Sequence, residues 1–459
     1  MGEREFDVIV IGAGPAGEVL AGRLAERGHE TALVESRLVG GECSFYACMP
    51  SKALLRPAEL LGEARRVPGV REAVTGELDA GAVLRRRDEI IHDLDDAHQL
   101  PWLTDRGVTL VRAHGRLEGE RLVRAGDELL RARRAVAIAT GSEPAIPPIP
   151  GLADARPWTN REATTSKIVP PRLLVLGGGV AGVELGQAFA TLGSSVTLVE
   201  GGPRVLAREE PFAADAVGAA LRDRGVTVLT GVTATQVQRP ATGGEVTLTL
   251  EDGRELTGDE LLVAVGRRPA TRAIGLEAIG LEPGQYLHVD DRMCVEGHPW
   301  LYAVGDVNGR VLLTHMGKYQ ARVASFVIDG GDARATQDGP GSPRVIFTDP
   351  QVAAVGLTEA AAREAGLAVR TVSYPSSGTG GASFVGSRTP GSSQLVVETA
   401  RDVIVGATFV GFEVAEWLHA ATIAVTGEVP IARLWDCVPA FPTRSEVWLR
   451  LLEADETAR

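Results

Sequence analysis

Residues 7–35 read DVIVIGAGPAGEVLAGRLAERGHETALVE, and this segment sets the architecture of the chain. A short apolar strand runs into the turn Gly12-Ala-Gly14-Pro-Ala-Gly17, a helical stretch follows, and a second strand ends on Glu35. In such a unit Gly12 permits a tight turn, Gly14 lets the backbone approach a pyrophosphate, and Gly17 lets helix and strand pack closely. The helix N-terminus offers N–H groups to the phosphates, and Glu35 offers a carboxylate to the ribose hydroxyls. The segment predicts a dinucleotide site.

The same order of elements returns about 165 residues later, at 172–200, as RLLVLGGGVAGVELGQAFATLGSSVTLVE. Its fingerprint glycines are Gly177, Gly179 and Gly182. Two copies at this separation indicate two nucleotide sites, because a solenoid would repeat at a far shorter period. Glu200 ends the second strand, and a carboxylate there favours NADH and repels the 2′-phosphate of NADPH. Arg204 softens that repulsion, so NADPH stays an alternative.

Composition and charge exclude several classes of function. The chain has 459 residues, which suggests about three domains. Its net charge of −13 argues against a nucleic-acid partner. The sequence has no run of about 18 apolar residues, so no membrane span is expected. The acidic residues Glu3 and Glu5 argue against a signal peptide, so we expect a cytoplasmic protein.

The rest of the chain differs from the two fingerprints in its predicted secondary structure. A helical stretch is expected near 83–99, and the proline-rich segment 142–151 is expected to link domains. Residues 341–459 mix helical and strand-like patterns, with a flexible surface loop expected at 373–384 from its Ser and Gly content.

Two cysteines, Cys43 and Cys48, lie close together in GGECSFYACMPSK at 40–52. In a regular helix this spacing is about 7.5 Å along the axis, whereas a disulfide needs Cα atoms within about 7 Å. A bridge therefore requires a distorted turn, which the preceding glycines and Pro50 permit. A zinc site would need two further ligands, and neither a second CxxC nor a nearby histidine is present. A redox pair and two unrelated buried thiols both stay open on spacing alone.

Together these motifs resemble the flavin-dependent pyridine nucleotide–disulfide oxidoreductases, the family that contains dihydrolipoamide dehydrogenase, glutathione reductase and mercuric reductase. The resemblance covers essentially the whole chain. Its marks are GAGPAG, CxxxxC followed by Met-Pro-Ser-Lys52, ATG at 139–141, GGGVAG with Glu184, GRRP at 266–269, AVGD ending at Asp306, THMGKYQA at 314–321 and FTDPQVAAVGLTE at 347–359.

The resemblance implies an α/β fold with two Rossmann-like domains, one for FAD and one for NAD(P)H, and a C-terminal α+β domain that forms a homodimer. The implied boundaries are 1–150 for the first part of the FAD domain, 151–270 for the NAD(P) domain, 271–335 for the second part of the FAD domain, and 341–459 for the dimerisation domain. Beyond the two fingerprints, the implied cofactor-binding residues are Lys52, Thr140, Gly141, Gly266, Arg267, Gly305 and Asp306.

The resemblance also implies roles for the site residues. Cys48 would lie against the flavin and Cys43 would meet the substrate. Lys52 would lie near the flavin, paired with Glu184, and Asp306 would hydrogen-bond the ribitol or phosphate side of FAD. Electrons from NAD(P)H would pass by way of FAD to the cysteine disulfide and then to an unidentified small-molecule or thiol acceptor.

One position departs from the family pattern. Disulfide-reducing members carry His-Pro-Thr-x-x-Glu near the C-terminus, where the histidine is the acid/base for the substrate-facing thiol. Here Phe441 occupies the histidine position, while Glu446 is in place. General acid–base catalysis contributes about 10²–10⁴-fold, so rapid dihydrolipoamide or glutathione turnover is not expected.

Several alternatives therefore stay open. The chain could act on a non-disulfide substrate, as mercuric reductase and the ketopropyl-coenzyme M oxidoreductase/carboxylase do, since both also replace this histidine by an aromatic residue. It could instead be a catalytically weak flavoprotein that serves as a redox sensor or binding module. Tyr46 is either a substitute proton donor or a space-filling residue, and Cys437 is either a buried small residue or a third redox thiol.

Overall fold

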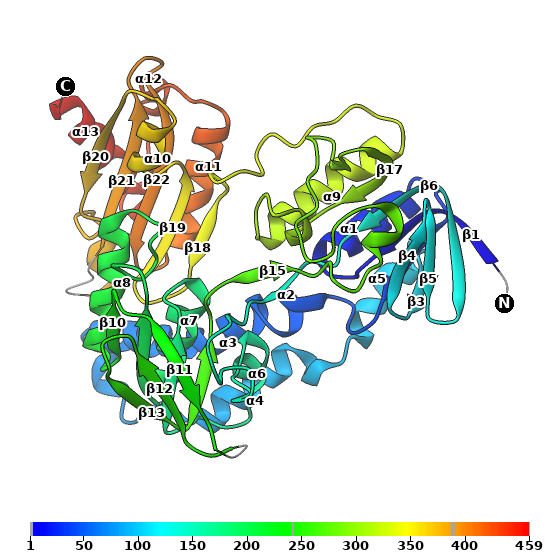
Figure 1. Cartoon of the computed structure of the whole chain (residues 1–459). Helices are drawn as coiled ribbons and strands as arrows, with labels where there is room; N and C mark the ends of the chain where they lie inside the picture. Colours follow the sequence, from blue (N-terminus) through cyan, green and yellow to red (C-terminus); the bar gives the residue numbers. More distant parts are fainter. Residues whose placement is uncertain (1–2, 241–242, 387–390, 459) are drawn as a thin grey trace. The chain divides into compact units, whose positions relative to one another are not determined.

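The computed structural model describes residues 3–240, 243–386 and 391–458 (Figure 1). Its contacts divide the chain into two compact units. The first unit comprises residues 1–50, 88–145 and 266–340. The second unit comprises residues 51–87, 146–265 and 341–459.

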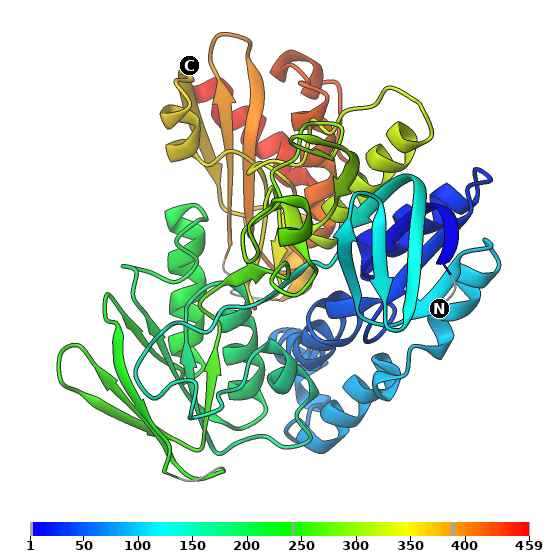
Figure 2. The same ribbon diagram turned by 45° about the vertical axis from the view of Figure 1, so that its right-hand side comes forward.

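The first unit is built on an eight-stranded sheet. Its main path runs β16 (Cys294–Val295), β17 (His298–Ala303), β6 (Glu128–Ile138), β1 (Glu3–Ile11), β2 (Thr31–Glu35) and β3 (Thr109–Arg112). From β17 to β3 the strands are parallel. The strands β4 (Gly115–Gly119) and β5 (Leu122–Ala125) join β6 in an antiparallel meander, drawn in cyan in Figure 2.

Strand β1 shows why its residues form a central strand. Val8 and Val10 lie in one core with the helices α1 (Pro15–Ala25) and α9 (Thr314–Ile328), while Ile9 and Ile11 lie in a second core with the meander. Successive side chains of a strand point to opposite faces, and both faces are covered, so the run is apolar throughout.

The first unit also contains several short elements. These are α2 (Gly41–Phe45), the beginning of α3 (Cys48–Arg66), α5 (Leu100–Thr104), and the paired strands β7 (Ser142–Pro144) and β15 (Arg267–Pro269). Helix α3 begins in the first unit and continues into the second.

The second unit holds a four-stranded parallel sheet ordered β10 (Thr227–Thr230), β9 (Ser195–Glu200), β8 (Arg172–Leu176) and β14 (Glu260–Val263). Its helices are α6 (Asn160–Thr165), α7 (Val180–Thr191) and α8 (Pro211–Asp223). A separate antiparallel sheet contains β11 (Ala234–Gln238), β12 (Val246–Leu250) and β13 (Glu255–Gly258).

The C-terminal part of this unit is a five-stranded antiparallel sheet. Its order is β18 (Arg344–Ile346), β19 (Gln351–Gly356), β22 (Val403–Gly411), β21 (Ser392–Glu398) and β20 (Val369–Tyr374). The accompanying helices are α10 (Glu359–Glu364), α11 (Leu418–Thr426), α12 (Ile431–Leu434) and α13 (Val447–Ala458). The mixed α/β class with parallel sheets expected from the sequence is confirmed.

Two local expectations are only partly right. The helix expected near 83–99 is α4 (Ala80–Ile90), which ends because the residues 92–94 adopt positive φ and cannot continue a right-handed helix. The segment 373–384 is not simply a surface loop, since Ser376 and Thr379 are buried and the Ser376 hydroxyl lies 2.8 Å from that of Ser393. None of the helices in the described part of the chain has the length and apolar composition that a bilayer crossing requires.

Candidate functional site

The first fingerprint forms a turn that only small residues fit. Gly12 has φ +103°, and a Cβ there would lie 2.5 Å from the Ala139 carbonyl oxygen. A Cβ on Gly17 would lie 1.9 Å from the Gly12 carbonyl oxygen, so the helix could not pack on the turn. Gly14, in contrast, has no atom within 4 Å of a built Cβ and stands just before α1. The open space at the helix N-terminus suits a phosphate.

Other residues of the first unit fit a bound dinucleotide. The Glu35 carboxylate accepts the Ala13 and Arg37 N–H groups, each at 2.7 Å, and so fixes the turn while keeping lone pairs for further donors. The Thr140 hydroxyl is buried and has no hydrogen-bond partner among the described residues. Because buried polar atoms are normally paired, this orphan indicates a bound group beside it.

Asp306 lies in a polar cluster of the same unit. Its carboxylate accepts the Ser142 hydroxyl at 2.5 Å and lies 3.9 Å from the Arg267 guanidinium. Arg267 donates to the Ser142 hydroxyl at 2.6 Å and lies 3.6 Å from Glu42. Burial raises the pKa of Asp306, and the Ser142 and Arg267 contacts oppose that rise. The glycines Gly141 and Gly266 stand just before the paired strands β7 and β15 that bring Ser142 and Arg267 together.

The cysteine pair lies at a break between two helices. Helix α2 ends before Tyr46, whose φ of −132° and ψ of −4° leave the helical region, and α3 begins at Cys48. The sulfur atoms of Cys43 and Cys48 converge on one hydroxyl. The Thr314 Oγ1 lies 3.1 Å from the Cys43 sulfur and 3.5 Å from the Cys48 sulfur. The fold thus brings the two sulfurs to one point.

The surroundings of Cys43 disfavour its ionisation. Its hydrogen bond with Cys48 and its burial raise the pKa of the Cys43 thiol, while Thr314 and the charge of Lys318 act in the opposite direction. Exchange reactions proceed through the thiolate, so a group that removes the Cys43 proton would speed them.

The second fingerprint repeats the first within the second unit. Gly177 has φ +110°, and a Cβ there would lie 2.5 Å from the Ala264 carbonyl oxygen. The Glu200 carboxylate accepts the N–H groups of Gly178 and Gly202, each at 2.6 Å. The buried Nη1 atom of Arg204 makes no hydrogen bond within the described chain.

Lys52 and Glu184 form a pair in the second unit. The Lys52 Nζ donates to the Glu184 Oε2 at 2.7 Å, and Glu184 is only 3% exposed. The other Glu184 oxygen accepts the Phe347 N–H at 2.9 Å, and the Lys52 ammonium lies 4.8 Å from the Phe347 ring centroid. A buried carboxylate and a ring face therefore both hold the Lys52 cation.

The C-terminal motif holds its glutamate for a local reason. Glu446 is buried, and its carboxylate accepts the Gly380 N–H at 2.7 Å and the Arg450 guanidinium at 2.6 Å. These contacts lower the pKa of Glu446. Phe441, in contrast, is 78% exposed. Glu446 therefore has a structural role that does not need a histidine at position 441.

The remaining candidates are less informative. Tyr46 is half-buried, and burial raises its pKa. The expectation that Cys437 is a buried small residue is wrong, because its side chain is exposed at the end of a turn and its thiol donates to the Arg433 carbonyl at 3.6 Å.

Sequence reasoning gave no role to Thr314 and Ser142. Thr314 belongs to a quoted motif and Ser142 follows the ATG motif, but neither has a distinctive spacing to its partners. Their importance depends on strands and helices that are far apart in the chain, which only the fold brings together.

Comparison with known proteins agrees with this geometry. Residues 6–321 match the model of the pyridine nucleotide-disulphide oxidoreductases, and residues 342–451 match the dimerisation domain of the same family. The chain belongs to this family, whose members are flavoprotein oxidoreductases that use FAD with NAD(P)H.

Individual relatives include both kinds of enzyme considered above. The chain is 34% identical to a dihydrolipoyl dehydrogenase of Thermus scotoductus, covering 98% of this chain and 97% of the relative. It is also 34% identical to a mercuric reductase of Acidithiobacillus ferrooxidans, covering 94% and 79%. Among solved structures, the HOCl-induced flavoprotein disulfide reductase RclA of Escherichia coli, in a Cu(II) complex, matches with a TM-score of 0.86 at 26% identity, covering 98% and 99%.

Proposed function

We propose that the chain is an FAD-dependent NAD(P)H oxidoreductase in which Cys43 and Cys48 cycle between disulfide and dithiol and reduce an acceptor. The observation that carries this proposal is the convergence of both sulfurs on the Thr314 hydroxyl. Two thiols held at one point can form a bond and release it without a large movement of the backbone.

The proposal assigns FAD to the first fingerprint. Gly12, Gly14 and Gly17 would hold its pyrophosphate, and Glu35 its ribose. FAD, when bound, supplies the conversion between hydride and thiol chemistry. The orphaned Thr140 hydroxyl and the buried Asp306 carboxylate support a polar ligand in this unit. NAD(P)H would bind at the second fingerprint.

The proposed domains are 1–150 and 271–335 for FAD, 151–270 for NAD(P)H and 341–459 for dimerisation. One sheet unites strands from residues 3–138 and 294–303, which supports a split first domain. The parallel sheet of residues 172–263 supports a separate nucleotide domain.

We also propose that Lys52 would lie near FAD as a fixed cation. Its bond to buried Glu184 restricts its position, and its ammonium lies 4.8 Å from the Phe347 ring centroid. NADH would be preferred over NADPH, because Glu200 presents a carboxylate at the end of its strand.

The acceptor would be something other than an ordinary disulfide. In the proposed homodimer, the partner subunit's Phe441 would face Cys43 and would offer no proton acceptor. The exposed side chain of Phe441 in the single chain supports a contact with another molecule. Quinones, metal ions, or substrates that bring their own proton donor would suffer less from this absence.

The test begins with the purified protein. We expect about one FAD per chain and a dimer in size-exclusion chromatography with light scattering. Under anaerobic conditions, NADH should add two alkylatable thiols to the peptide that contains Cys43 and Cys48, measured by mass spectrometry. It should also produce a long-wavelength absorption band that is lost in Cys48→Ser.

The matched control is Cys437→Ser, which removes an exposed thiol elsewhere and should leave both signals intact. A folded protein that binds no FAD, or a flavoprotein whose cysteine pair NADH cannot reduce, would contradict the proposal. A screen with lipoamide, glutathione disulfide, quinones and metal ions then ranks the acceptors.

A further inference from the structure

A buried glutamine connects the Asp306 turn to helix α9. Gln320 is fully buried on this helix. Its side-chain oxygen accepts the Gly305 N–H at 2.7 Å and the Asn308 amide at 2.9 Å. Its side-chain nitrogen donates to the Asp338 Oδ2 at 2.8 Å. Both lone pairs of the amide oxygen and one hydrogen of the amide nitrogen are therefore used, which fixes the orientation of the amide.

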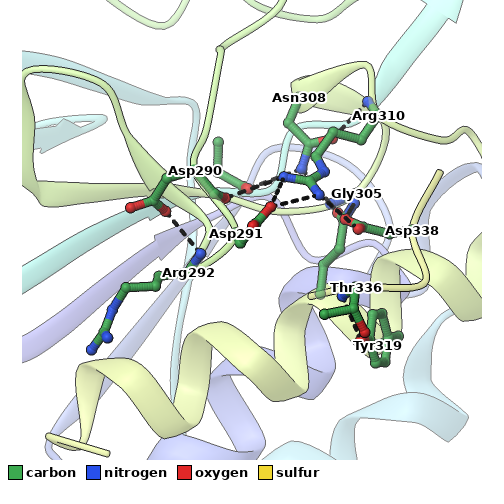
Figure 3. A network of polar contacts seen from close by, with 11 residues as sticks. Asp290, Asp291, Arg292, Gly305, Asn308, Arg310, Tyr319, Thr336 and Asp338 are labelled. Atoms are coloured by element: carbon green, nitrogen blue, oxygen red, sulfur yellow. Dashed lines mark hydrogen bonds and ion pairs between the residues drawn. The ribbon is translucent and has the colours of Figure 1, made fainter. Parts of the chain in front are cut away.

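Arg310 connects Asp338 to Asn308, and Figure 3 shows these three residues. Its guanidinium donates to the Asp338 Oδ1 at 2.9 Å, and its backbone N–H donates to the Asn308 Oδ1 at 3.0 Å. We call Asn308, Arg310, Gln320 and Asp338 the polar ring. Asp338 is only 2% exposed, and both of its oxygens are satisfied within the ring.

The polar ring makes hydrogen bonds to backbone groups near Asp306, whereas the Asp306 carboxylate has a different partner. Gly305 precedes Asp306 and has φ +79°, and its N–H is held by Gln320. Asn308 follows two residues later, and its amide also donates to the Ala303 carbonyl at 3.1 Å. The Asp306 side chain points instead to Ser142. The backbone and the side chain of Asp306 are thus fixed by separate sets of contacts.

Burying the polar ring costs free energy, so its presence needs a reason other than filling space. A buried ion pair and a buried amide lose their hydration, and apolar residues of similar volume would often fill the same space with equal or greater stability. What the ring adds is a directional hold on one turn.

We propose that Gln320 and Asp338 are positioning residues of the FAD site, which fix the turn from Gly305 to Asn308 and thereby hold Asp306 for the cofactor. This inference rests on the proposed FAD function of the first unit. Neither residue would touch FAD, and both would act through Asp306.

The experiment first adds a negative charge to the ring and then, in a double variant, moves the original charge from position 338 to position 320. Gln320→Glu removes the donor that faces Asp338 and sets two carboxylates against each other. We expect FAD to bind at least about tenfold more weakly, because a charged hydrogen bond is lost and the turn loosens. In Gln320→Glu combined with Asp338→Asn, the amide at 338 donates to the carboxylate at 320. The charge of the ring is unchanged, and FAD affinity should return to within about threefold of wild type.

The primary readout is the FAD dissociation constant, from flavin fluorescence on dilution of the holoenzyme. The second readout is the visible circular dichroism of the bound flavin, which reports its surroundings and which a general loss of stability does not change. The control is Ser325→Ala, a buried residue of the same helix whose hydroxyl donates to the Arg322 carbonyl and accepts from the side chains of Arg23 and Arg27. It should lower the melting temperature and leave FAD affinity and dichroism unchanged.

The outcomes distinguish a failure of the proposed function from a failure of the positioning role alone. Wild type that takes up no FAD removes the proposed function. Wild type that binds FAD, with Gln320→Glu binding it equally well, overturns only the positioning role. A double variant no better than Gln320→Glu overturns it too. If Gln320→Glu does not fold, Asp338→Asn alone decides, since it conserves volume: wild-type FAD affinity and dichroism contradict the proposal, and weaker binding with altered dichroism supports it.

Discussion

The two fingerprint turns have nearly the same backbone and different surroundings. Gly12 and Gly177 have φ of +103° and +110°, and a Cβ on either would lie 2.5 Å from the carbonyl oxygen of the residue that follows a strand. Behind the first turn stands the buried hydroxyl of Thr140, which has no hydrogen-bond partner in the described chain, whereas the second has Val265, which is 43% exposed. The shared turn provides a place for phosphates, and the neighbouring side chains decide what else is bound.

The helices after the turns differ in a second way. Glu18 in α1 and Val183 in α7 occupy equivalent positions, 165 residues apart, and the next residue of α7 is Glu184. Glu184 has a cation and a backbone N–H as partners. Burial instead raises the pKa of Glu18 to about 7. The two helices thus carry acids in different surroundings: Glu184 of α7 is paired with Lys52, whereas Glu18 of α1 is poorly solvated.

Breaking each turn separately should give the largest effects. Gly12→Ala forces a positive φ on alanine and drives its Cβ into a carbonyl, so FAD affinity should fall at least about 100-fold. Gly177→Ala should leave FAD bound and weaken NADH binding by a similar factor. The measurements are the flavin-to-protein absorbance ratio and NADH titration of the flavin spectrum.

Each of these variants is the control for the other. Loss of FAD in both would show that the substitutions unfold the protein. Loss of FAD only in Gly177→Ala would reverse the assignment of the two sites.

Much of the fold could be predicted from the sequence, because the strand, glycine turn, helix and closing acid of each fingerprint are local in the chain. The acid Glu35 lies at the end of β2, where its spacing from Gly12 placed it. The burial of Ser376 could not be predicted, since it depends on contact with Ser393 of another strand. For the same reason the position of Thr314 between the two sulfurs left no signal in the sequence.

Restoring a proton carrier at the C-terminal motif should have the next largest effect. Phe441→His should raise lipoamide or glutathione disulfide reduction at least about tenfold, since a base would assist a thiol whose pKa is raised. The gain should be smaller than in an optimised site, because Gly380 and Arg450 already occupy the Glu446 carboxylate. Steady-state rates with NADH measure it.

Phe441→Leu is the control, because it changes the ring without adding a base and should leave these rates low. Wild type that already turns over either disulfide at about 10 s⁻¹ or more would show that the missing histidine is not limiting.

A smaller effect should follow from removing the acid of the second fingerprint. Glu200→Ala should reduce the preference for NADH over NADPH about fivefold, the value of one or two lost hydrogen bonds. The Arg204 guanidinium, whose Nη1 lies 3.8 Å from Asp215, would then meet the 2′-phosphate without repulsion from Glu200. Stopped-flow reduction of the flavin by each nucleotide measures the ratio. Glu35→Ala should leave that ratio unchanged, and equal rates for both nucleotides in wild type would refute the premise.

The smallest effect concerns Glu18 and depends on pH. Its pKa rises from 4.5 to about 7 on folding, chiefly by burial, although the Lys318 charge opposes the rise. Between these values the folded state binds more protons than the unfolded state, so the free energy of unfolding falls as pH rises and the loss is complete above about pH 7. Because Glu18 is only partly buried, the loss should be about 1–2 kcal/mol, less than the shift alone would give.

Glu18→Gln should therefore raise the melting temperature by about 1–3 °C at pH 8 and leave it nearly unchanged at pH 5, where wild-type Glu18 is already protonated in the folded state. The measurement is thermal unfolding of both holoenzymes at the two pH values. Glu89→Gln, at an exposed position of α4, is the control and should show no pH-dependent difference. An equal gain at both pH values would mean that the glutamine packs better than the acid, and that the titration of Glu18 does not distinguish the first helix from the second.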